Sequence, residues 1–306
     1  MQNDRIGCRS EQECIDIQNG KEYECHLFPV CAAAFLEEIK MVVFHTDLDN
    51  TIIYSYKHEI GAVKRSVEMY QGREISFITE YTYQLLQQVR EKMLVVPTST
   101  RSIEQYRRID LGVGAFPYAL VCNGGILLAD GKRDDSWYRA SLALIGRSEE
   151  ELEKALHFLE KDVRRKFELR FIERLFVFTK CREPKQTVDN LREVLDTELV
   201  DVFHNGEKVY VVPRDLNKGK AVQRFREYIH ADFVIAAGDS EFDIPMLRDA
   251  DEGLAPYGFA EEYGVDFAVR QMDGRKVFAE SLLEECLLLF KQKLGDAAFQ
   301  VFSKHF

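Results

Sequence analysis

The sequence of 306 residues predicts an α/β fold in which a smaller α+β domain is inserted into a mostly parallel sheet. From Met41 onward, short apolar runs typical of buried strands alternate with helical patterns. In the middle of the chain an α-β-β-α-β-β pattern replaces this alternation, which resumes near residue 214. Buried strands that alternate with helices are typical of parallel sheets covered on both faces. The expected division is an extension at 1–40, a sheet domain at 41–125 and 214–306, and an inserted domain at 126–213.

The first half of the sheet domain contains three predicted strands and one predicted helix. The strands are "MVVFHT" from Met41, "MLVVPTS" from Met93 and "YALVCN" from Tyr118. The helix, at 78–92, has its apolar and aromatic residues at helical spacing. An insertion between Tyr54 and Ser76 follows the first strand, and its Gln71-Gly72 pair predicts a hairpin.

The inserted domain is predicted to begin with a helix after Ser148, because Glu151 three residues later completes a capping-box pattern. Its apolar face is expected to extend from Leu152 through Val163 to Phe167. Then come two strands, "FELRFI" and "RLFVFTK", a helix from Pro184 to about Thr197, and two strands, "LVDVF" and "KVYVV", joined by Asn205-Gly206. The sheet domain then resumes with a helix at 218–229, the strands "DFVIAA" and "DFAV", and an apolar C-terminal helix.

Composition limits the class of protein. The chain is 46% hydrophobic and 30% charged, as in ordinary globular proteins, and its formal net charge is −11. Such a charge argues against a general affinity for nucleic acid or anionic membranes. No apolar run reaches the roughly 18 residues of a transmembrane helix. We therefore expect a cytoplasmic protein without a nucleic-acid or membrane partner. The expected oligomeric state is a monomer or homodimer.

Four of the seven cysteines lie in the first 31 residues. Their spacing does not match the usual zinc-binding patterns, so a poorly packed extension is expected there rather than a metal site. The periodic structure is expected to begin only near Met41. The other three cysteines, Cys122, Cys181 and Cys286, are expected to be small core residues.

Polar residues follow several predicted strands. Asp47 and Asp49 end the first strand on the same side, which is costly for like charges unless a cation, hydrogen bonds or a shared proton compensates. An Asx-type turn is the alternative interpretation of this stretch alone. The other positions are Thr98-Ser99-Thr100 before Arg101, Lys218 at a helix start, and Gly238-Asp239-Ser240 with Asp243. Functional residues of open α/β sheets gather at the carboxyl ends of the strands, so these positions predict one site.

In this order, the four motifs resemble those of the haloacid dehalogenase superfamily, which consists mainly of phosphatases. The matching segments are "DLDNT" at 47–51, "PTSTRS" at 97–102, "NKGKAV" at 217–222 and "GDSEFD" at 238–243. The "CNGG" at 122–125 also fits the branch with a large C2-type cap, which includes phosphatases of sucrose phosphate and mannosylglycerate phosphate. The resemblance covers about residues 41–294. It implies a Rossmann-like core and identifies the inserted α+β domain as a cap.

The resemblance implies a Mg²⁺-dependent phosphatase that hydrolyses a small phosphorylated metabolite, such as a sugar or polyol phosphate. Asp47 would attack phosphorus to form an aspartyl-phosphate. Asp49 would serve as general acid and then base. Ser99 and Lys218 would bind the phosphoryl oxygens, and Lys218 is favoured over Lys220 because it precedes the glycine. The alternatives are a phosphotransferase or phosphomutase with the same intermediate, and a non-catalytic regulatory protein.

The resemblance also implies a magnesium site. Asp47, the backbone carbonyl of Asp49 and the carboxylate of Asp239 would be its ligands, since Mg²⁺ prefers hard oxygen atoms. Asp243 would support the metal through a ligand water or by orienting Lys218. The expected substrate-binding residues are Thr51, Thr98, Arg101, Asn123, Gly124 and, in the cap, Arg174. Further cap candidates are Trp137, Arg139 and His204.

Overall fold

A computed structural model describes residues 6–10, 13–16, 22–24 and 41–294 in two units, Met1–Ile39 and Lys40–Phe306. The first unit contains strands β1 (Ile6–Ser10), β2 (Glu13–Asp16) and β3 (Glu22–Glu24), which form an antiparallel sheet. The expectation that regular structure begins only near Met41 is therefore wrong. Cys8 is paired with Cys14 in the register of β1 and β2. Cys25 and Cys31 lie outside the described residues.

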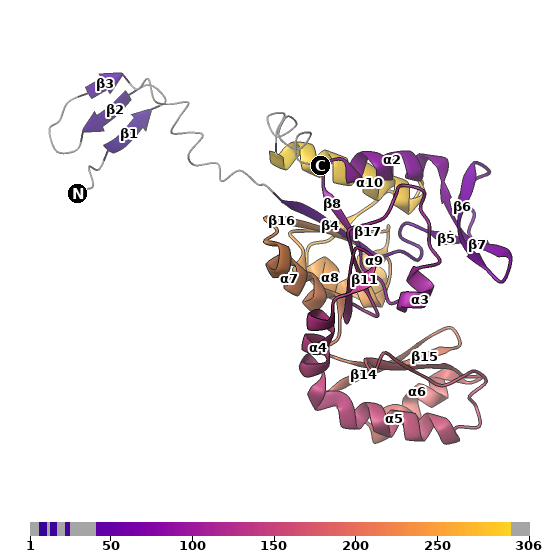
Figure 1. Cartoon of the computed structure of the whole chain (residues 1–306). Helices are drawn as coiled ribbons and strands as arrows, with labels where there is room; N and C mark the ends of the chain where they lie inside the picture. The colour runs from indigo at the N-terminus through magenta and orange to yellow at the C-terminus, as the bar shows by residue number, and fades with distance from the viewer. Residues whose placement is uncertain (1–5, 11–12, 17–21, 25–40, 295–306) are drawn as a thin grey trace. The chain divides into compact units, whose positions relative to one another are not determined.

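The second unit is built on a five-stranded sheet in the order β18-β17-β16-β4-β8, all parallel (Figure 1). Strand β4, between β16 and β8, is apolar except at its end and buried throughout, which is typical of a sheet covered on both faces. The expected α/β class is confirmed. The strands are β4 (Val42–Thr46), β8 (Leu94–Pro97), β16 (Phe233–Ala237), β17 (Glu252–Ala255) and β18 (Arg270–Gln271). The last strand thus begins at Arg270, beyond the predicted "DFAV".

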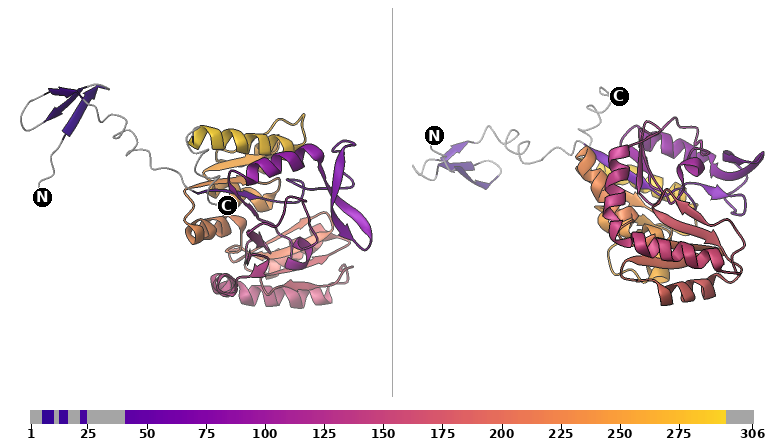
Figure 2. Two further views of the ribbon diagram at one scale, coloured as in Figure 1. Left: turned by 45° about the horizontal axis from the view of Figure 1, so that its top comes forward. Right: turned by 60° about the horizontal axis from the view of Figure 1, so that its bottom comes forward.

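Two pairs of helices pack beside this sheet. Helices α2 (Glu80–Arg90) and α10 (Phe278–Leu294) lie side by side, as Figure 2 shows. Helices α7 (Lys218–Ile229) and α8 (Ile244–Asp249) form the other pair. Short helices α3 (Ile103–Tyr106) and α9 (Phe259–Tyr263) and the 3-10 turn η2 (Glu241–Asp243) complete this part. No helix among the described residues is long and apolar enough to cross a membrane.

The predicted hairpin is present after the first strand. It consists of β6 (Lys64–Tyr70) and β7 (Arg73–Thr79), with β5 (Tyr54–Ser55) on the other side of β7. Gln71 and Gly72 both have positive φ, as a two-residue hairpin turn requires. Strand β7 continues to Thr79, which caps α2, so that helix starts two residues later than predicted. We call β6 and β7 the flap hairpin.

A second short sheet begins beside β8. Strand β9 (Tyr118–Val121) pairs with β10 (Ile126–Ala129), which pairs with β11 (Lys132–Arg133), and α4 (Asp135–Leu144) follows. Leu127 and Trp137 belong to the buried cluster that contains Val43 and Phe225 of the main sheet domain. Residues just after 126 therefore pack on the sheet domain, and the division at 126 and 213 stays a prediction.

The cap has the predicted order of elements. Its strands form an antiparallel sheet in the order β12-β13-β15-β14, which we call the cap sheet. The helices pack on the face of this sheet that points away from the main sheet (Figure 1). The elements are η1 (Gly146–Ser148), α5 (Glu149–Lys161), β12 (Arg170–Ile172), β13 (Phe176–Lys180), α6 (Pro184–Val194), β14 (Val200–Asn205) and β15 (Lys208–Pro213).

Two details of the cap differ from the predictions. Ser148 makes no side-chain cap bond, because its hydroxyl donates to the Leu199 carbonyl. The Glu151 carboxylate accepts from the Asp196 amide, so the predicted capping box is absent. Helix α5 ends at Lys161, and Val163 is 88% exposed rather than part of its apolar face.

The predicted burial of Cys122, Cys181 and Cys286 is confirmed.

Candidate active site

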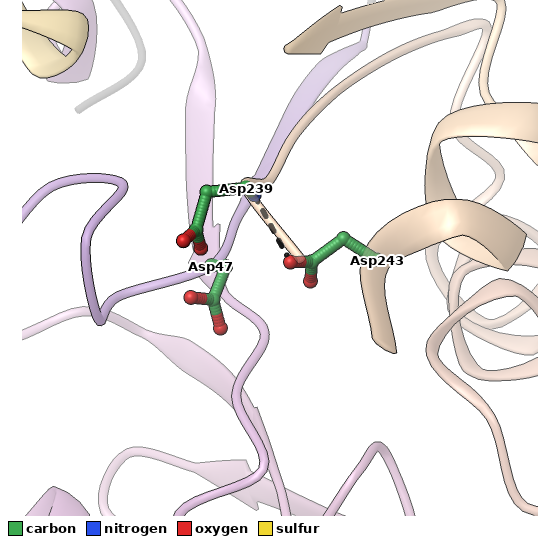
Figure 3. Close-up of side chains that lie close together, drawn as sticks. All are labelled: Asp47, Asp239 and Asp243. Atoms are coloured by element: carbon green, nitrogen blue, oxygen red, sulfur yellow. Dashed lines mark hydrogen bonds between the residues drawn. The ribbon is translucent and has the colours of Figure 1, made fainter. Parts of the chain in front are cut away.

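Three aspartates meet where neighbouring strands β4 and β16 end (Figure 3). Asp47 follows β4, and its amide donates to the Ala237 carbonyl at 2.8 Å. Asp239 follows β16, and Asp243 lies one turn later. One carboxylate oxygen from each of the three lies within 4.8 Å of the others. A Cβ atom at Gly238 would lie 2.3 Å from the Cβ of Asp243, so only glycine permits this approach.

Lys218 connects two of these carboxylates. It is the first residue of α7, whose N-cap is Asn217. Its ammonium donates to Asp47 Oδ1 and Asp243 Oδ1, both at 2.5 Å, and only 1% of the residue is exposed. Lys220 instead forms an ion pair with Asp215. The structure therefore brings Lys218, and not Lys220, to the carboxylates.

Both oxygens of Asp243 are occupied by protein donors. Oδ1 accepts from Lys218, while Oδ2 accepts from the amides of Asp239 and Ser240 and from the Ser240 hydroxyl. This carboxylate thus fixes the loop after β16 and orients the lysine. Of the two roles expected for Asp243, the geometry fits the orientation of Lys218.

The electrostatics of the centre favour a bound cation. Burial and the neighbouring Asp243, Asp239 and Asp49 carboxylates raise the pKa of Asp47, although Lys218 opposes them. Burial and Asp243 raise the pKa of Asp239 to about 7. Burial alone would lower the pKa of Lys218, but the Asp243 and Asp47 carboxylates outweigh this effect, so the pKa of Lys218 is raised. One ammonium faces three carboxylates, so a divalent cation with oxygen ligands fits the remaining negative charge.

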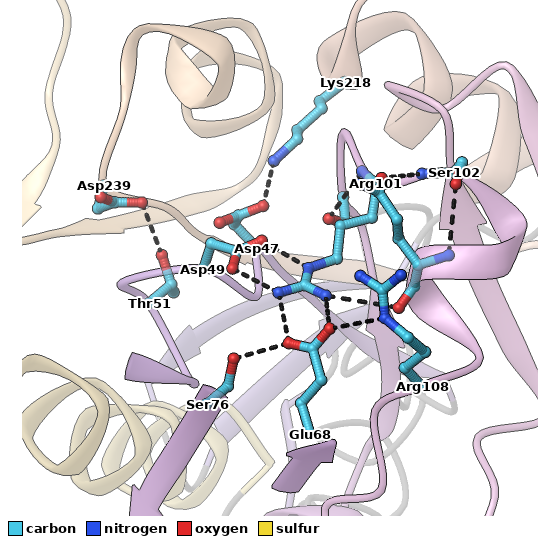
Figure 4. Close-up of polar contacts among 12 residues, drawn as sticks. Asp47, Asp49, Thr51, Glu68, Ser76, Arg101, Ser102, Arg108, Lys218 and Asp239 are labelled. Carbon is cyan, nitrogen blue, oxygen red and sulfur yellow. Dashed lines mark hydrogen bonds and ion pairs between the residues drawn. The ribbon is translucent and has the colours of Figure 1, made fainter. Parts of the chain in front are cut away.

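A second network holds Asp49 (Figure 4). Arg101 donates from Nε and Nη2 to the two oxygens of Asp49, both at 2.7 Å. The same guanidinium donates to Glu68 of the flap hairpin at 2.8 and 3.0 Å. The Glu68 side chain is fully buried and also accepts from Ser76 at 2.7 Å and Arg108 at 3.1 Å. Arg101 therefore lies between two carboxylates, one at the site and one in the hairpin.

The charges of this network stabilise one another. Burial opposes ionisation of Glu68, but hydrogen bonds from Arg101, Ser76 and Arg108 outweigh it and lower the pKa of Glu68. Burial also opposes the charge of Arg101, and its bonds to Asp49 and Glu68 outweigh that and raise its pKa. Sequence reasoning missed Glu68 and Arg108, since neither belongs to a motif and a charged residue in a hairpin strand is usually solvated.

Comparisons with known proteins concern the family and the fold of the chain. The sequence model of the haloacid dehalogenase-like hydrolases matches residues 132–256. The sucrose-phosphatase of Synechocystis sp. PCC6803, solved with sucrose and phosphate, has a similar fold with a TM-score of 0.57 at 17% identity. The superposition covers 82% of this chain and 98% of that enzyme. Residues 132–256 match the haloacid dehalogenase-like hydrolases, and this confirms the resemblance to that superfamily seen in the four sequence motifs.

A second structure of similar fold comes from Thermoplasma acidophilum. Its TM-score is 0.54 at 15% identity, and the match covers 82% of this chain and 98% of the other. At such identities the likeness concerns the fold alone. No curated protein matches the sequence.

In the second motif, at 97–102, the neighbouring hydroxyl groups of Thr98 and Ser99 have different hydrogen-bond partners. Thr98 donates to the Val96 carbonyl at 3.1 Å and bonds to His45 Nδ1 at 2.9 Å, so its hydroxyl is used inside the core. Burial lowers the pKa of His45 to about 3, so this histidine is neutral. The Ser99 hydroxyl accepts from the amide of Arg101 at 3.2 Å, and the guanidinium of the same arginine holds Asp49. The geometry favours Ser99 over Thr98 as the motif residue.

Three further predicted residues make hydrogen bonds or close packing contacts around the site. The Thr51 hydroxyl donates to Asp239 Oδ1 at 3.2 Å. Gly124 has a φ of +84°, and a Cβ there would lie 2.2 Å from the Cβ of Ala221, so the turn fits closely against α7. Asn123 donates to the Leu216 carbonyl, and its Oδ1 has no partner among the described residues. Asn123 also lines a cavity of about 470 Å³ together with cap residues of β14.

The structure does not bring the predicted cap residues to the carboxylates. Arg174 is exposed and pairs with Glu149 at the start of α5. The Trp137 indole donates to the Gly124 carbonyl within the core. Arg139 donates to Ser136, on its own helix. His204, in β14, shares the strand face of Val200 and Val202, which pack against the cap helices.

Proposed function

We propose that the protein is a Mg²⁺-dependent phosphatase of a small phosphorylated metabolite, such as a sugar or polyol phosphate. The observation that supports this most directly is the contact of buried Lys218 with Asp47 beside Asp239. A nucleophilic carboxylate, a buried ammonium and a second carboxylate for a cation are what transfer of a phosphoryl group to an aspartate requires.

Asp47 would attack phosphorus and expel the alcohol, with its carboxylate becoming an aspartyl-phosphate. Lys218 holds that carboxylate in place at 2.5 Å and would neutralise negative charge on the phosphoryl oxygens. Ser99, which is completely buried and bonded to the Arg101 amide, would donate its hydroxyl to one of these oxygens. Water would then attack the intermediate and return Asp47 to its carboxylate form.

Asp49 would protonate the leaving alcohol and later remove a proton from the attacking water. Two hydrogen bonds from Arg101 fix the Asp49 carboxylate, and Glu68 fixes Arg101 from the other side. About half of the Asp49 side chain is exposed, so it remains accessible to substrate and water. The network therefore supplies the positioning that a general acid and base needs.

Magnesium would be held by the carboxylates of Asp47 and Asp239 and by the backbone carbonyl of Asp49. When bound, it supplies positive charge that lowers the repulsion between the nucleophile and the phosphoryl oxygens. Thr51 would orient Asp239 through its hydroxyl.

Phosphate release from a panel of sugar, polyol, nucleotide and cofactor phosphates tests the proposal. It would be measured with and without Mg²⁺, with Asp47→Asn as the blank. Metal-dependent release that is lost in this variant supports the proposal. If folded protein releases no phosphate from any substrate in the presence of Mg²⁺, the phosphatase proposal is wrong; transfer of phosphate to a sugar acceptor would then indicate a transferase.

A further inference from the structure

The cap sheet has one face without helices, and this face points toward the catalytic carboxylates. Val177 and Val209 lie on the opposite face, where they pack against α5 and α6. Side chains alternate along a strand, so Phe178 and Tyr210 lie on the open face. The Tyr210 ring lies 5.5 Å from the ring of Phe242, in the turn η2 between Asp239 and α8. The open face thus packs against the motif that holds the proposed metal site.

Two lysines lie on this open face at directly opposed positions. Lys180 of β13 pairs with Lys208 of β15 in the register of the sheet, two residues beyond the Phe178–Tyr210 pair. Directly opposed like charges destabilise a sheet. Among the described residues, no carboxylate forms an ion pair with either lysine. Lys180 contacts the ring of Phe167 at 5.2 Å, and Glu207, next to Lys208 in the chain, pairs with Lys166.

Lys208 is close enough to the site to interact with its charges. Desolvation lowers the pKa of Lys208, Asp49 opposes this effect, and the cations Lys180 and Arg101 add to it. Burial raises the pKa of Tyr210, and Asp49 adds to that increase. The Lys208 side chain nevertheless remains exposed to solvent. Lys208 is an accessible ammonium on the open face that packs against the Phe242 segment, and it has no ion-pair partner among the described residues. It is therefore placed to meet the leaving-group part of a substrate.

We propose that Lys180 and Lys208 bind a second anionic group, a carboxylate or a phosphate, on the leaving-group part of the substrate. This inference rests on the proposed function, since it assumes that the first phosphate lies at Asp47. Tyr210 and Phe178 would contact the carbon skeleton between the two anions. The substrate class is then a phosphate monoester with a second negative charge, rather than a neutral sugar phosphate.

Matched pairs of substrates test this proposal. 2-Phosphoglycerate and glycerol 2-phosphate differ by one carboxylate, and fructose 1,6-bisphosphate and fructose 6-phosphate differ by one phosphate. We expect the wild type to have a higher kcat/KM for the doubly anionic member of at least one pair. Lys208→Met is expected to reduce this preference roughly 10- to 100-fold, the range of one charge-assisted hydrogen bond, mainly through KM. Lys180→Met should act in the same direction. The pair that responds shows which anion is bound.

Lys161→Met is the matched control, because this exposed lysine ends α5 on the other face of the cap sheet. It is expected to leave the preference unchanged. The inference is overturned if the wild type does not distinguish the members of either pair, or if Lys208→Met lowers kcat/KM equally for both members.

Calorimetric binding of the same compounds to Asp47→Asn separates this inference from the proposed function. If the doubly anionic compound binds more tightly and Lys208→Met abolishes the difference while wild-type protein hydrolyses neither compound, the phosphatase proposal fails and the anion site stands. If hydrolysis occurs but neither binding nor turnover depends on the second anion, the anion site fails alone.

Discussion

Replacing Glu68 with glutamine tests how the flap hairpin supports the site. The substitution keeps the shape of the side chain but removes a fully buried charge that accepts bonds from Arg101, Arg108 and Ser76. The new amide group also faces guanidinium donors, to which it cannot donate. Both stability and catalysis should therefore respond.

The expected loss of stability follows from these contacts. Removing one partner of a buried ion pair costs about 3–5 kcal/mol, and a charge-assisted hydrogen bond contributes about 1.5–3 kcal/mol. Part of this is offset, because Arg101 keeps Asp49 as a partner and the Arg108 side chain is 24% exposed. We expect the free energy of unfolding to fall by about 2–4 kcal/mol, which lowers Tm by roughly 4–8 °C in a protein of this size.

Thermal unfolding followed by circular dichroism measures this change. Glu74→Gln is the control, since Glu74 lies on the same hairpin with its side chain exposed. A surface change of this kind is expected to stay within about 0.5 kcal/mol. Equal Tm values for wild type and Glu68→Gln would refute the assignment of Glu68 as a stabilising ion-pair partner.

The catalytic effect should depend on the leaving group. If Asp49 is the general acid, loosening Arg101 harms substrates whose leaving alcohol needs a proton. We expect Glu68→Gln to lower kcat about 10- to 100-fold for glycerol 2-phosphate, within the range of general acid catalysis. The loss should be about threefold or less for p-nitrophenyl phosphate, whose phenolate leaves without one. Equal losses for both substrates would contradict the positioning of Asp49 through Glu68.

Three other predictions follow from the site. Asp239 has a raised pKa of about 7 in the folded chain, so it binds its proton more tightly there than when unfolded. The proton on Asp239 therefore stabilises the metal-free fold at low pH, and this stabilisation should be lost as pH rises from about 4 to 7. The increase in Tm caused by Mg²⁺ should grow over the same range, and a pH-independent increase would contradict this prediction. Lys218→Met should lower kcat by about 10²–10³-fold, measured as phosphate release, and a loss below tenfold would contradict its role. Gly124→Ala should lower the free energy of unfolding, measured by chemical denaturation, by about 1–3 kcal/mol more than Gly131→Ala, because only the new Cβ at 124 collides with Ala221. Equal losses of stability would contradict the close packing.

The sequence by itself determined the order of the elements and the chemistry at the strand ends. Alternation of buried strands with helices predicted a parallel sheet, and pairs such as Gln71-Gly72 predicted turns, because these patterns depend on neighbouring residues. The carboxyl ends of adjacent parallel strands lie at one edge, so the sequence predicts that Asp47 and Asp239 lie close together.

Tertiary structure alone decided which side chains meet across that edge. Glu68 became part of the site because the flap hairpin folds against Arg101, and no local pattern reports such a contact. Arg174 pairs with Glu149 of α5, whereas Lys208 lies on the open face of the cap sheet, because the packing of α5 and α6 on one face selects which face remains open. Sequence patterns determine the faces of an element, whereas the long-range packing of those faces determines which side chains share a site.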